Sequence, residues 1–106
     1  MGNIHLKALF MVVNAGFAED VIEIAREEGA KGATIFNARG EGSHHESFLG
    51  ITVDTEKEMV FCITDEHTAE KAMESVKDKA GIKTAAHCIC FTMPVEKTAG
   101  LVDIGV

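Results

Sequence analysis

The chain has no tyrosine, only one proline and only three cysteines among its 106 residues. With no stretch rich in proline, glycine and serine to act as a linker, a single domain over residues 1–106 is expected. An odd number of cysteines is not a disulfide framework and favours a reduced, cytoplasmic protein with small buried thiols. There is no apolar run near the ~18 residues of a membrane-spanning helix and no signal-peptide pattern. Basic residues are also scarce, and the formal charge of −7 argues against a nucleic-acid partner, which would need a basic face.

The apolar residues that are present follow two alternating periods. Helical spacing predicts helices that end at Gly29 and Gly81, the second capped by Thr64 or Asp65. Apolar runs predict strands at residues 5–13, 32–38, 58–63 and 85–93, the last stopped by Pro94, with a short strand at 51–53 and a charged turn at 54–57. Two strand–helix–strand units give an α+β, ferredoxin-like βαββαβ fold, with a four-stranded, mainly antiparallel sheet and two helices on one face.

The predicted strands are apolar on both of their faces. In the first strand, Phe10 and Val12 point one way while Leu9 and Met11 point the other, and the third and last strands show the same pattern. Two helices can cover only one face of the sheet. The remaining apolar face is too large for a soluble monomer, so a closed homo-oligomer through that face is expected.

A polar excursion at residues 39–50 separates the two units and is the place where function is expected. Gly40, Gly42 and Gly50 punctuate it. Glycine permits positive φ and close approach of the backbone to a ligand, and consecutive N–H groups can form an anion-binding nest. The alternative is that these glycines only shape a turn.

Three features of the chain resemble the PII signal-transduction family, the trimeric regulators of nitrogen metabolism. The first is Lys31-Gly-Ala-Thr-Ile followed by Arg39-Gly-Glu-Gly42, which looks like the strand that leads into the family's long T-loop. The second is the order of strands and helices on each side of that loop. The third is Phe91-Thr-Met-Pro-Val-Glu-Lys-Thr-Ala-Gly-Leu101, which is similar to the family's last strand and its continuation.

The resemblance implies a homotrimeric signalling protein that regulates nitrogen metabolism and is not an enzyme. It would bind a small effector, an adenine nucleotide such as ATP, ADP or AMP, in clefts between subunits. Residues 39–50 would act as a T-loop that switches with the ligand and contacts a partner protein. The residues implied at the ligand are Thr34, Arg39, Gly40, Gly42 and Lys83.

The chain also departs from the family pattern, so a divergent, PII-like member is expected. The family's glycine-rich loop before the last strand ends in a lysine that holds phosphates, whereas Gly81-Ile-Lys-Thr-Ala-Ala-His-Cys88 keeps one glycine and has Lys83 early. Gly100 and Val102 fall near the positions of two family arginines. Fewer cations predict a weakly held nucleotide or a different small ligand. The T-loop tyrosine that the family uses for uridylylation is missing, which excludes that modification.

Histidines give an alternative function, a trimeric metal-binding protein. His44 and His45 lie on the loop, and three copies or His87 of a neighbour could complete a site for zinc, copper or nickel. Solvated loop histidines are the simpler interpretation. Cys88 and Cys90 favour structural core thiols over a soft-metal pair. No nucleophile has a base at a fixed spacing, which also argues against an enzyme.

Overall fold

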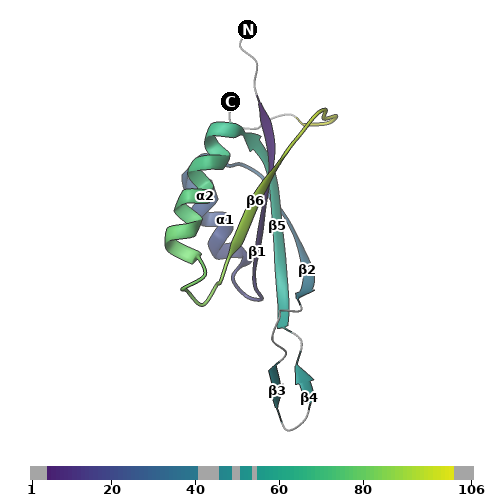
Figure 1. Cartoon of the computed structure of the whole chain (residues 1–106). Coiled ribbons are helices and arrows are strands. Elements are labelled where there is room, and N and C mark those ends of the chain that lie inside the picture. The colour runs from purple at the N-terminus through teal and green to yellow at the C-terminus, as the bar shows by residue number, and fades with distance from the viewer. Residues whose placement is uncertain (1–4, 41–45, 49–50, 54, 102–106) are drawn as a thin grey trace.

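The computed structural model describes residues 5–40, 46–48, 51–53 and 55–101. A sheet of four antiparallel strands in the order β2-β5-β1-β6 forms one layer. Both helices lie on one side of it (Figure 1). This arrangement confirms the predicted ferredoxin-like fold. The elements are β1 (Leu6–Asn14), α1 (Ala18–Glu27), β2 (Thr34–Gly40), β3 (Glu46–Phe48), β4 (Ile51–Val53), β5 (Thr55–Asp65), α2 (Glu66–Ala80) and β6 (Ile89–Pro94).

Helix α2 follows β5 without an intervening residue. Asp65 ends the strand and also caps the helix, since its carboxylate accepts a hydrogen bond of 3.1 Å from the Thr68 N–H. Of the two residues that the sequence offered as the cap, the structure selects Asp65, whereas Thr64 is fully buried. The hydrogen bond from Thr68 lowers the pKa of Asp65. Neither α1 nor α2, the helices among the described residues, has the length and apolar character needed to cross a membrane.

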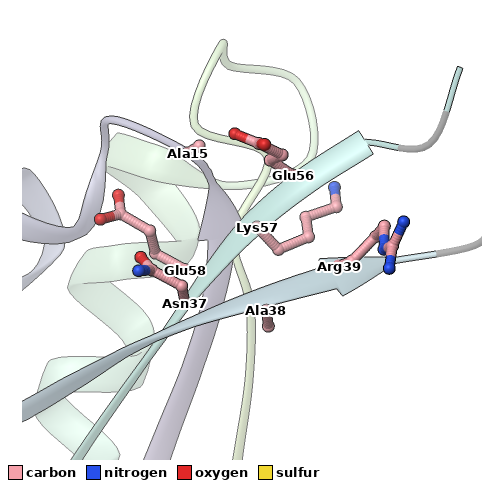
Figure 2. A pocket seen from close by; sticks show the side chains of 7 residues that line it. All are labelled: Ala15, Asn37, Ala38, Arg39, Glu56, Lys57 and Glu58. Atoms are coloured by element: carbon pink, nitrogen blue, oxygen red, sulfur yellow. The ribbon is translucent and has the colours of Figure 1, made fainter.

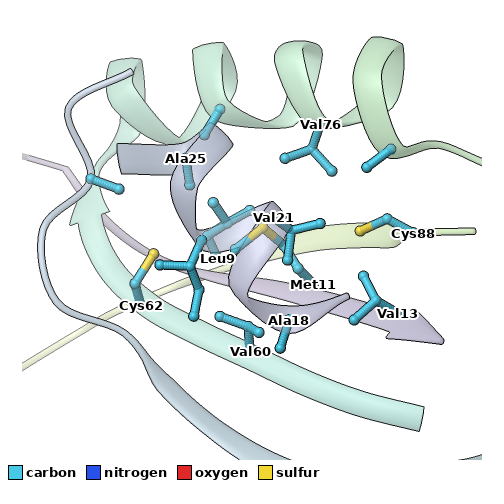
Figure 3. Close-up of a cluster of buried hydrophobic side chains, with 14 of the residues drawn as sticks. Leu9, Met11, Val13, Ala18, Val21, Ala25, Val60, Cys62, Val76 and Cys88 are labelled. Carbon is cyan, nitrogen blue, oxygen red and sulfur yellow. The ribbon is translucent and has the colours of Figure 1, made fainter. Parts of the chain in front are cut away.

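The core lies between the helices and one face of the sheet (Figure 3). Strand β1 supplies the odd-numbered residues of its apolar run, and Val60 and Cys62 of β5 join them, as the predicted alternation requires. The helices contribute small residues, which let them pack closely on the sheet. The core cluster comprises Leu9, Met11, Val13, Ala18, Val21, Ile22, Ala25, Ala30, Val60, Cys62, Ala72, Val76, Ala80, Ala86 and Cys88.

Three strands begin two or more residues away from the start that the sequence predicts. Strand β6 begins at Ile89 rather than at residue 85, because residues 81–88 form turns, with N–H groups of Thr84 and His87 bonded to carbonyls three residues earlier. Strand β2 begins at Thr34 rather than at residue 32. Strand β5 begins at Thr55, so residues 55–57, expected in a charged turn, instead pair with the end of β2.

The excursion at residues 39–50 is partly regular. Strand β2 continues through Gly40, and beyond it β3 pairs with β4 in a small antiparallel hairpin, which we call the arm. The sequence predicted β4 but missed β3. The arm continues outward past the end of β2 and β5 (Figure 1). Of the predicted site residues, Gly42, His44 and His45 lie outside the described part of the chain.

The sheet face opposite the helices, here called the open face, carries a row of aromatic rings across all four strands. The ring centroids of Phe10 lie 5.6 Å from Phe61 and 5.0 Å from Phe91, both stacked, and Phe36 lies 6.1 Å from Phe61. Phe91 is 42% exposed and Ile89 is 57% exposed. The alternation predicted from sequence is therefore confirmed, and within the described residues neither helix covers this face. Its apolar residues are Leu6, Ala8, Phe10, Val12, Phe36, Met59, Phe61, Ile63, Ile89, Phe91 and Met93.

Candidate functional site

Strand β2 carries three of the predicted ligand residues, but at its two opposite ends. Thr34 begins the strand, whereas Arg39 and Gly40 end it. At about 3.3 Å per residue, the six steps from Thr34 to Gly40 span roughly 20 Å. The two ends therefore cannot contact the same small molecule within one chain.

At the Arg39 end, a hollow of about 570 Å³ opens beside the base of the arm; we call it the base hollow. Arg39 and Lys57 extend toward its outer end, while Asn37 and Glu58 lie at the inner end (Figure 2). The hollow therefore separates its cations from the Glu58 carboxylate. Its lining residues are Ala15, Asn37, Ala38, Arg39, Glu56, Lys57 and Glu58.

Asn14 ties three elements together next to this hollow. Its side-chain oxygen accepts a hydrogen bond of 2.6 Å from the Lys57 ammonium, and its amide nitrogen donates to the Ala85 carbonyl at 2.9 Å. Its backbone N–H donates to the Ala86 carbonyl, also at 2.9 Å. The turn at residues 81–88 is thereby held at the same end of the sheet as Lys57 and the arm.

Glu58 holds the start of α1 from a distant strand. Phe17 occupies the N-cap position of α1 and makes no side-chain capping bond. Glu58 Oε1 instead accepts from the Gly16 N–H at 2.7 Å and the Ala18 N–H at 3.3 Å. A carboxylate suits this place because the amino end of a helix carries partial positive charge. Glu58 is thus committed to the fold and is not available as a base.

Lys83 and His87 both lie on the turn between α2 and β6. Lys83 is exposed. His87 has a φ of +48°, which makes it the one non-glycine residue with positive φ among the described residues. Its Nδ1 lies 3.0 Å from the Ile82 carbonyl oxygen, which can only accept, so Nδ1 carries the proton. The structure therefore places Lys83 and His87 at the end of the sheet that holds Arg39 and Gly40, and away from Thr34.

A second hollow, of about 350 Å³, lies at the Thr34 end of β2; we call it the edge hollow. It exists because residues 31–33 run outside the sheet before β2 begins, opposite Cys62 and Ile63 of β5. Its walls combine apolar side chains with the Thr34 hydroxyl and the Lys31 side chain, a composition that suits a flat ring with polar atoms at its edge. The lining residues are Lys31, Gly32, Ala33, Thr34, Phe61, Cys62, Ile63 and Leu101.

The cysteines behave as core residues. Burial, followed by repulsion from Cys90, raises the pKa of Cys88 from 9.0 to about 12, and burial also raises the pKa of Cys62 and of Cys90. Since soft metals and electrophiles react with the thiolate, these protonated thiols are poor ligands and poor nucleophiles at neutral pH. This supports the structural interpretation of Cys88 and Cys90.

The raised pKa of Cys88 predicts a loss of stability in alkali. Above pH 9 the unfolded chain releases this proton while the folded chain retains it, so the contribution is complete below pH 9 and is lost as the pH rises toward 12. We expect the urea midpoint to fall over this range more steeply in the wild type than in Cys88→Ala. Equal slopes in the two proteins would contradict this assignment.

The metal hypothesis gains no support from the described residues. They contain no group of three histidine, cysteine, aspartate or glutamate side chains placed to hold an ion. The bond from His87 Nδ1 to a carbonyl is compatible with Nε2 as a ligand, since metal-binding histidines commonly donate their other ring nitrogen to such a partner. A site that uses His44, His45 and His87 stays a prediction.

Sequence reasoning named Arg39 but missed the other polar residues of the base hollow. The sequence prediction ends the first strand at residue 13, before Asn14, and puts Lys57 in a charged turn, whereas both are strand residues that face each other in the β1–β5 register. The available signal was the alternating charge of Glu56, Lys57 and Glu58 directly before an apolar run. Such a pattern indicates that the strand extends beyond the core and that its charged residues line a polar site.

The structure is thus a ferredoxin-like domain with an uncovered sheet face and a central arm beside a polar hollow. The chain belongs to the family described as "Nitrogen regulatory protein P-II", which it matches over residues 6–101. This confirms the resemblance seen in the sequence. Members of this family are regulatory signalling proteins, and the trimer and the T-loop are typical of them. No curated relative has a sequence that matches the chain.

Solved structures of the same fold agree with this assignment. A PII-like signalling protein from Thermus thermophilus is 23% identical, with a TM-score of 0.67 over 90% of this chain and 91% of that one. CPII, a nitrogen regulatory PII-like protein from Thiomonas intermedia K12 bound to ADP, AMP and bicarbonate, is 18% identical, with a TM-score of 0.68 over 92% and 97%. The GlnK–ATP complex of B. subtilis is 12% identical, with a TM-score of 0.66 over 87% and 84%. At these identities the likeness establishes the fold.

Proposed function

We propose that this protein is a homotrimeric sensor that binds an adenine nucleotide between its subunits and signals through residues 39–50. The observation that carries the proposal is the position of the two hollows at opposite ends of β2. Each is open and polar enough to form part of a ligand site, but neither encloses a ligand by itself. A cleft between two subunits would bring the edge hollow of one together with the base hollow of its neighbour.

The two hollows differ in a way that fits the two parts of a nucleotide. The edge hollow offers the Thr34 hydroxyl beside apolar side chains, which suits the adenine ring. The base hollow offers Arg39 and Lys57, which suit phosphates. The binding of ADP and AMP by CPII, and of ATP by B. subtilis GlnK, supports this choice of ligand.

The open face supplies the reason for assembly. Three sheets packed through their aromatic rows would remove the exposed apolar surface from water. The arm would then point away from the trimer, where a partner protein can reach it. Control of nitrogen metabolism through such a partner is the role suggested by the family description.

A mixing experiment with two variants tests the shared cleft. Thr34→Val removes the hydroxyl of the edge hollow, and Gly40→Val adds a Cβ that would lie 3.2 Å from the Lys57 side chain. Isothermal titration with ATP should show strong loss of binding in each variant alone. Trimers refolded from both should regain a fraction of the sites, because a Gly40→Val subunit and a Thr34→Val subunit together form one intact cleft.

Thermal shift provides the accompanying ligand survey. At ~100 times its dissociation constant, a ligand that binds only the folded state adds about 2.7 kcal/mol to stability, which raises Tm by several degrees. We expect ATP, ADP or AMP to give this shift, and Zn²⁺, Cu²⁺ and Ni²⁺ to give none after treatment with a chelator. A shift with metals alone would replace the nucleotide proposal by the metal-binding one.

In the mixing experiment with Thr34→Val and Gly40→Val, failure of the mixed trimers to recover ATP binding would contradict a cleft shared between subunits.

A further inference from the structure

The Lys57 ammonium is held in an unusual electrostatic situation. Lys57 is half-buried, and the hydrogen-bond partner of its ammonium is the neutral side-chain oxygen of Asn14, at 2.6 Å. Among the described residues, no carboxylate forms an ion pair with it. A partly desolvated cation without a counter-charge attracts an anion more strongly than a solvated surface lysine does.

Asn14 orients this cation without neutralising it. An ammonium group has three donors, and within the described residues Asn14 accepts one of them and no other acceptor is present. Asn14 is itself fixed by its bonds to the carbonyls of Ala85 and Ala86. The position of the Lys57 nitrogen is therefore set by the backbone of the turn at residues 81–88.

Gly40 supports the path of the Lys57 side chain. A Cβ at Gly40 would lie 3.2 Å from both Cγ and Cε of Lys57, so the lysine stem crosses directly over this glycine. The absence of a side chain at residue 40 lets the stem run along the end of β2. This gives Gly40 a function that does not depend on its turn conformation.

The two carboxylates that line the base hollow are directed away from the Lys57 ammonium. Glu58 lies at the inner end and is engaged by the N–H groups of Gly16 and Ala18. Glu56 lies above Lys57 and directs its carboxylate away from it (Figure 2). Arg39 extends to the same end as Lys57. An anion can therefore approach Lys57 from outside.

We propose that Lys57 is the residue that binds the phosphates of the ligand, with Asn14 as its positioning residue. This inference rests on the proposed function, and it names a cation from another part of the chain, since residues 84–88 hold no lysine and Gly100 and Val102 stand near the positions of the two family arginines. The positive charge belongs to Lys57 of β5, and the other residues of that strand are chiefly structural. The ligand class that this site selects is thus a nucleoside phosphate rather than a nucleoside.

The test compares ligands that differ only in phosphate. ATP, adenosine and inorganic tripolyphosphate are titrated calorimetrically into wild type, Lys57→Met, Lys57→Arg and Asn14→Asp. The control is Lys71→Met, which removes an exposed lysine of α2 that lies 3.9 Å from Glu28. Lys57→Met should weaken ATP and tripolyphosphate at least about tenfold, the value of one charge-assisted hydrogen bond, and leave adenosine within about twofold.

The other variants separate binding from folding. Asn14→Asp should weaken ATP as Lys57→Met does, because a carboxylate at this position pairs with the ammonium. Lys57→Arg should retain most of the ATP affinity, and Lys71→Met should retain all of it. In wild type, raising the salt concentration should weaken ATP binding more than it does in Lys57→Met, a response that a purely structural lysine would not change.

Each outcome bears on one proposal or the other. If wild type binds ATP and Lys57→Met binds it equally well, the role of Lys57 is overturned and the nucleotide function stands. If wild type binds tripolyphosphate through Lys57 but binds no nucleotide, the function is overturned and the anion site stands. Equal weakening of ATP and adenosine in Lys57→Met would show a structural role only and would overturn the inference.

Discussion

Replacing Phe91 by glutamate is expected to convert the proposed homotrimer into single chains. Phe91 lies on the edge strand β6 and is stacked on Phe10 of the open face, yet it remains 42% exposed in one subunit. The isolated chain therefore tolerates a polar residue there, whereas the packed face would bury the new carboxylate in each subunit. Burying an unpaired charge costs several kcal/mol per ion, and a trimer would incur this cost three times. Sedimentation should show that the mass falls from three times 11.4 kDa to the 11.4 kDa of a single chain.

The control for this experiment is a glutamate on another exposed apolar residue. Ile82 is 67% exposed and lies in the turn after α2, outside the sheet. Ile82→Glu should leave the mass unchanged. Circular dichroism should show folded protein in both variants. A Phe91→Glu protein that keeps three chains would contradict assembly through the open face. A monomeric wild type would remove the trimer from the proposal.

The second large effect is expected from Gly81→Ala. The Cβ of an alanine at this position would overlap the backbone carbonyl oxygen of Lys77 and lie 3.2 Å from the Lys77 carbonyl carbon. A flexible side chain could move aside, but this obstacle is the last turn of α2 itself. Overpacking of this kind costs about 1–3 kcal/mol or more, and a domain of this size loses roughly 4–8 °C in Tm for each kcal/mol. Chemical denaturation should report this loss directly.

Gly32→Ala provides the matched control for stability. An ideal Cβ at Gly32 meets no atom within 4 Å, so the same added methyl group should change the unfolding free energy by well under 1 kcal/mol. If Gly81→Ala were equally harmless, residues 81–88 would be free to shift far enough to relieve the overlap with the Lys77 carbonyl oxygen. That result would weaken the view that they hold Asn14 rigidly.

The order of the elements could be predicted from sequence because it depends on hydrophobic periodicity alone. Alternation placed Leu9 and Met11 on the opposite face of the strand from Phe10, as observed, and the structure shows that Leu9 and Met11 are the ones in the core. Boundaries were less accurate where local hydrogen bonds decide. Residues 85–88 have the apolar composition of a strand, but the bond from His87 N–H to Thr84 O closes a turn and delays β6.

The candidate site was only partly predictable because it depends on distance in space. Thr34 and Arg39 are close in sequence, which suggested one group of ligand residues, but an extended strand puts them at its two ends. Charge alternation could have marked Lys57 as a strand residue, but its proposed role requires the β1–β5 register, which places it opposite Asn14. A single sequence contains no direct information on that register.

The direct junction between β5 and α2 has a mechanical consequence. Asp65 is the last residue of the strand and the cap of the helix, so no slack separates the two elements. At the other end, β5 leads toward the arm within a few residues. A force applied to the arm along the strand would therefore be resisted by the hydrogen bonds of β5 along its whole length. It would also act directly on the amino end of α2. Strand β5 would thus connect the arm rigidly to the domain core, and a partner bound to the arm could not move it independently of that core.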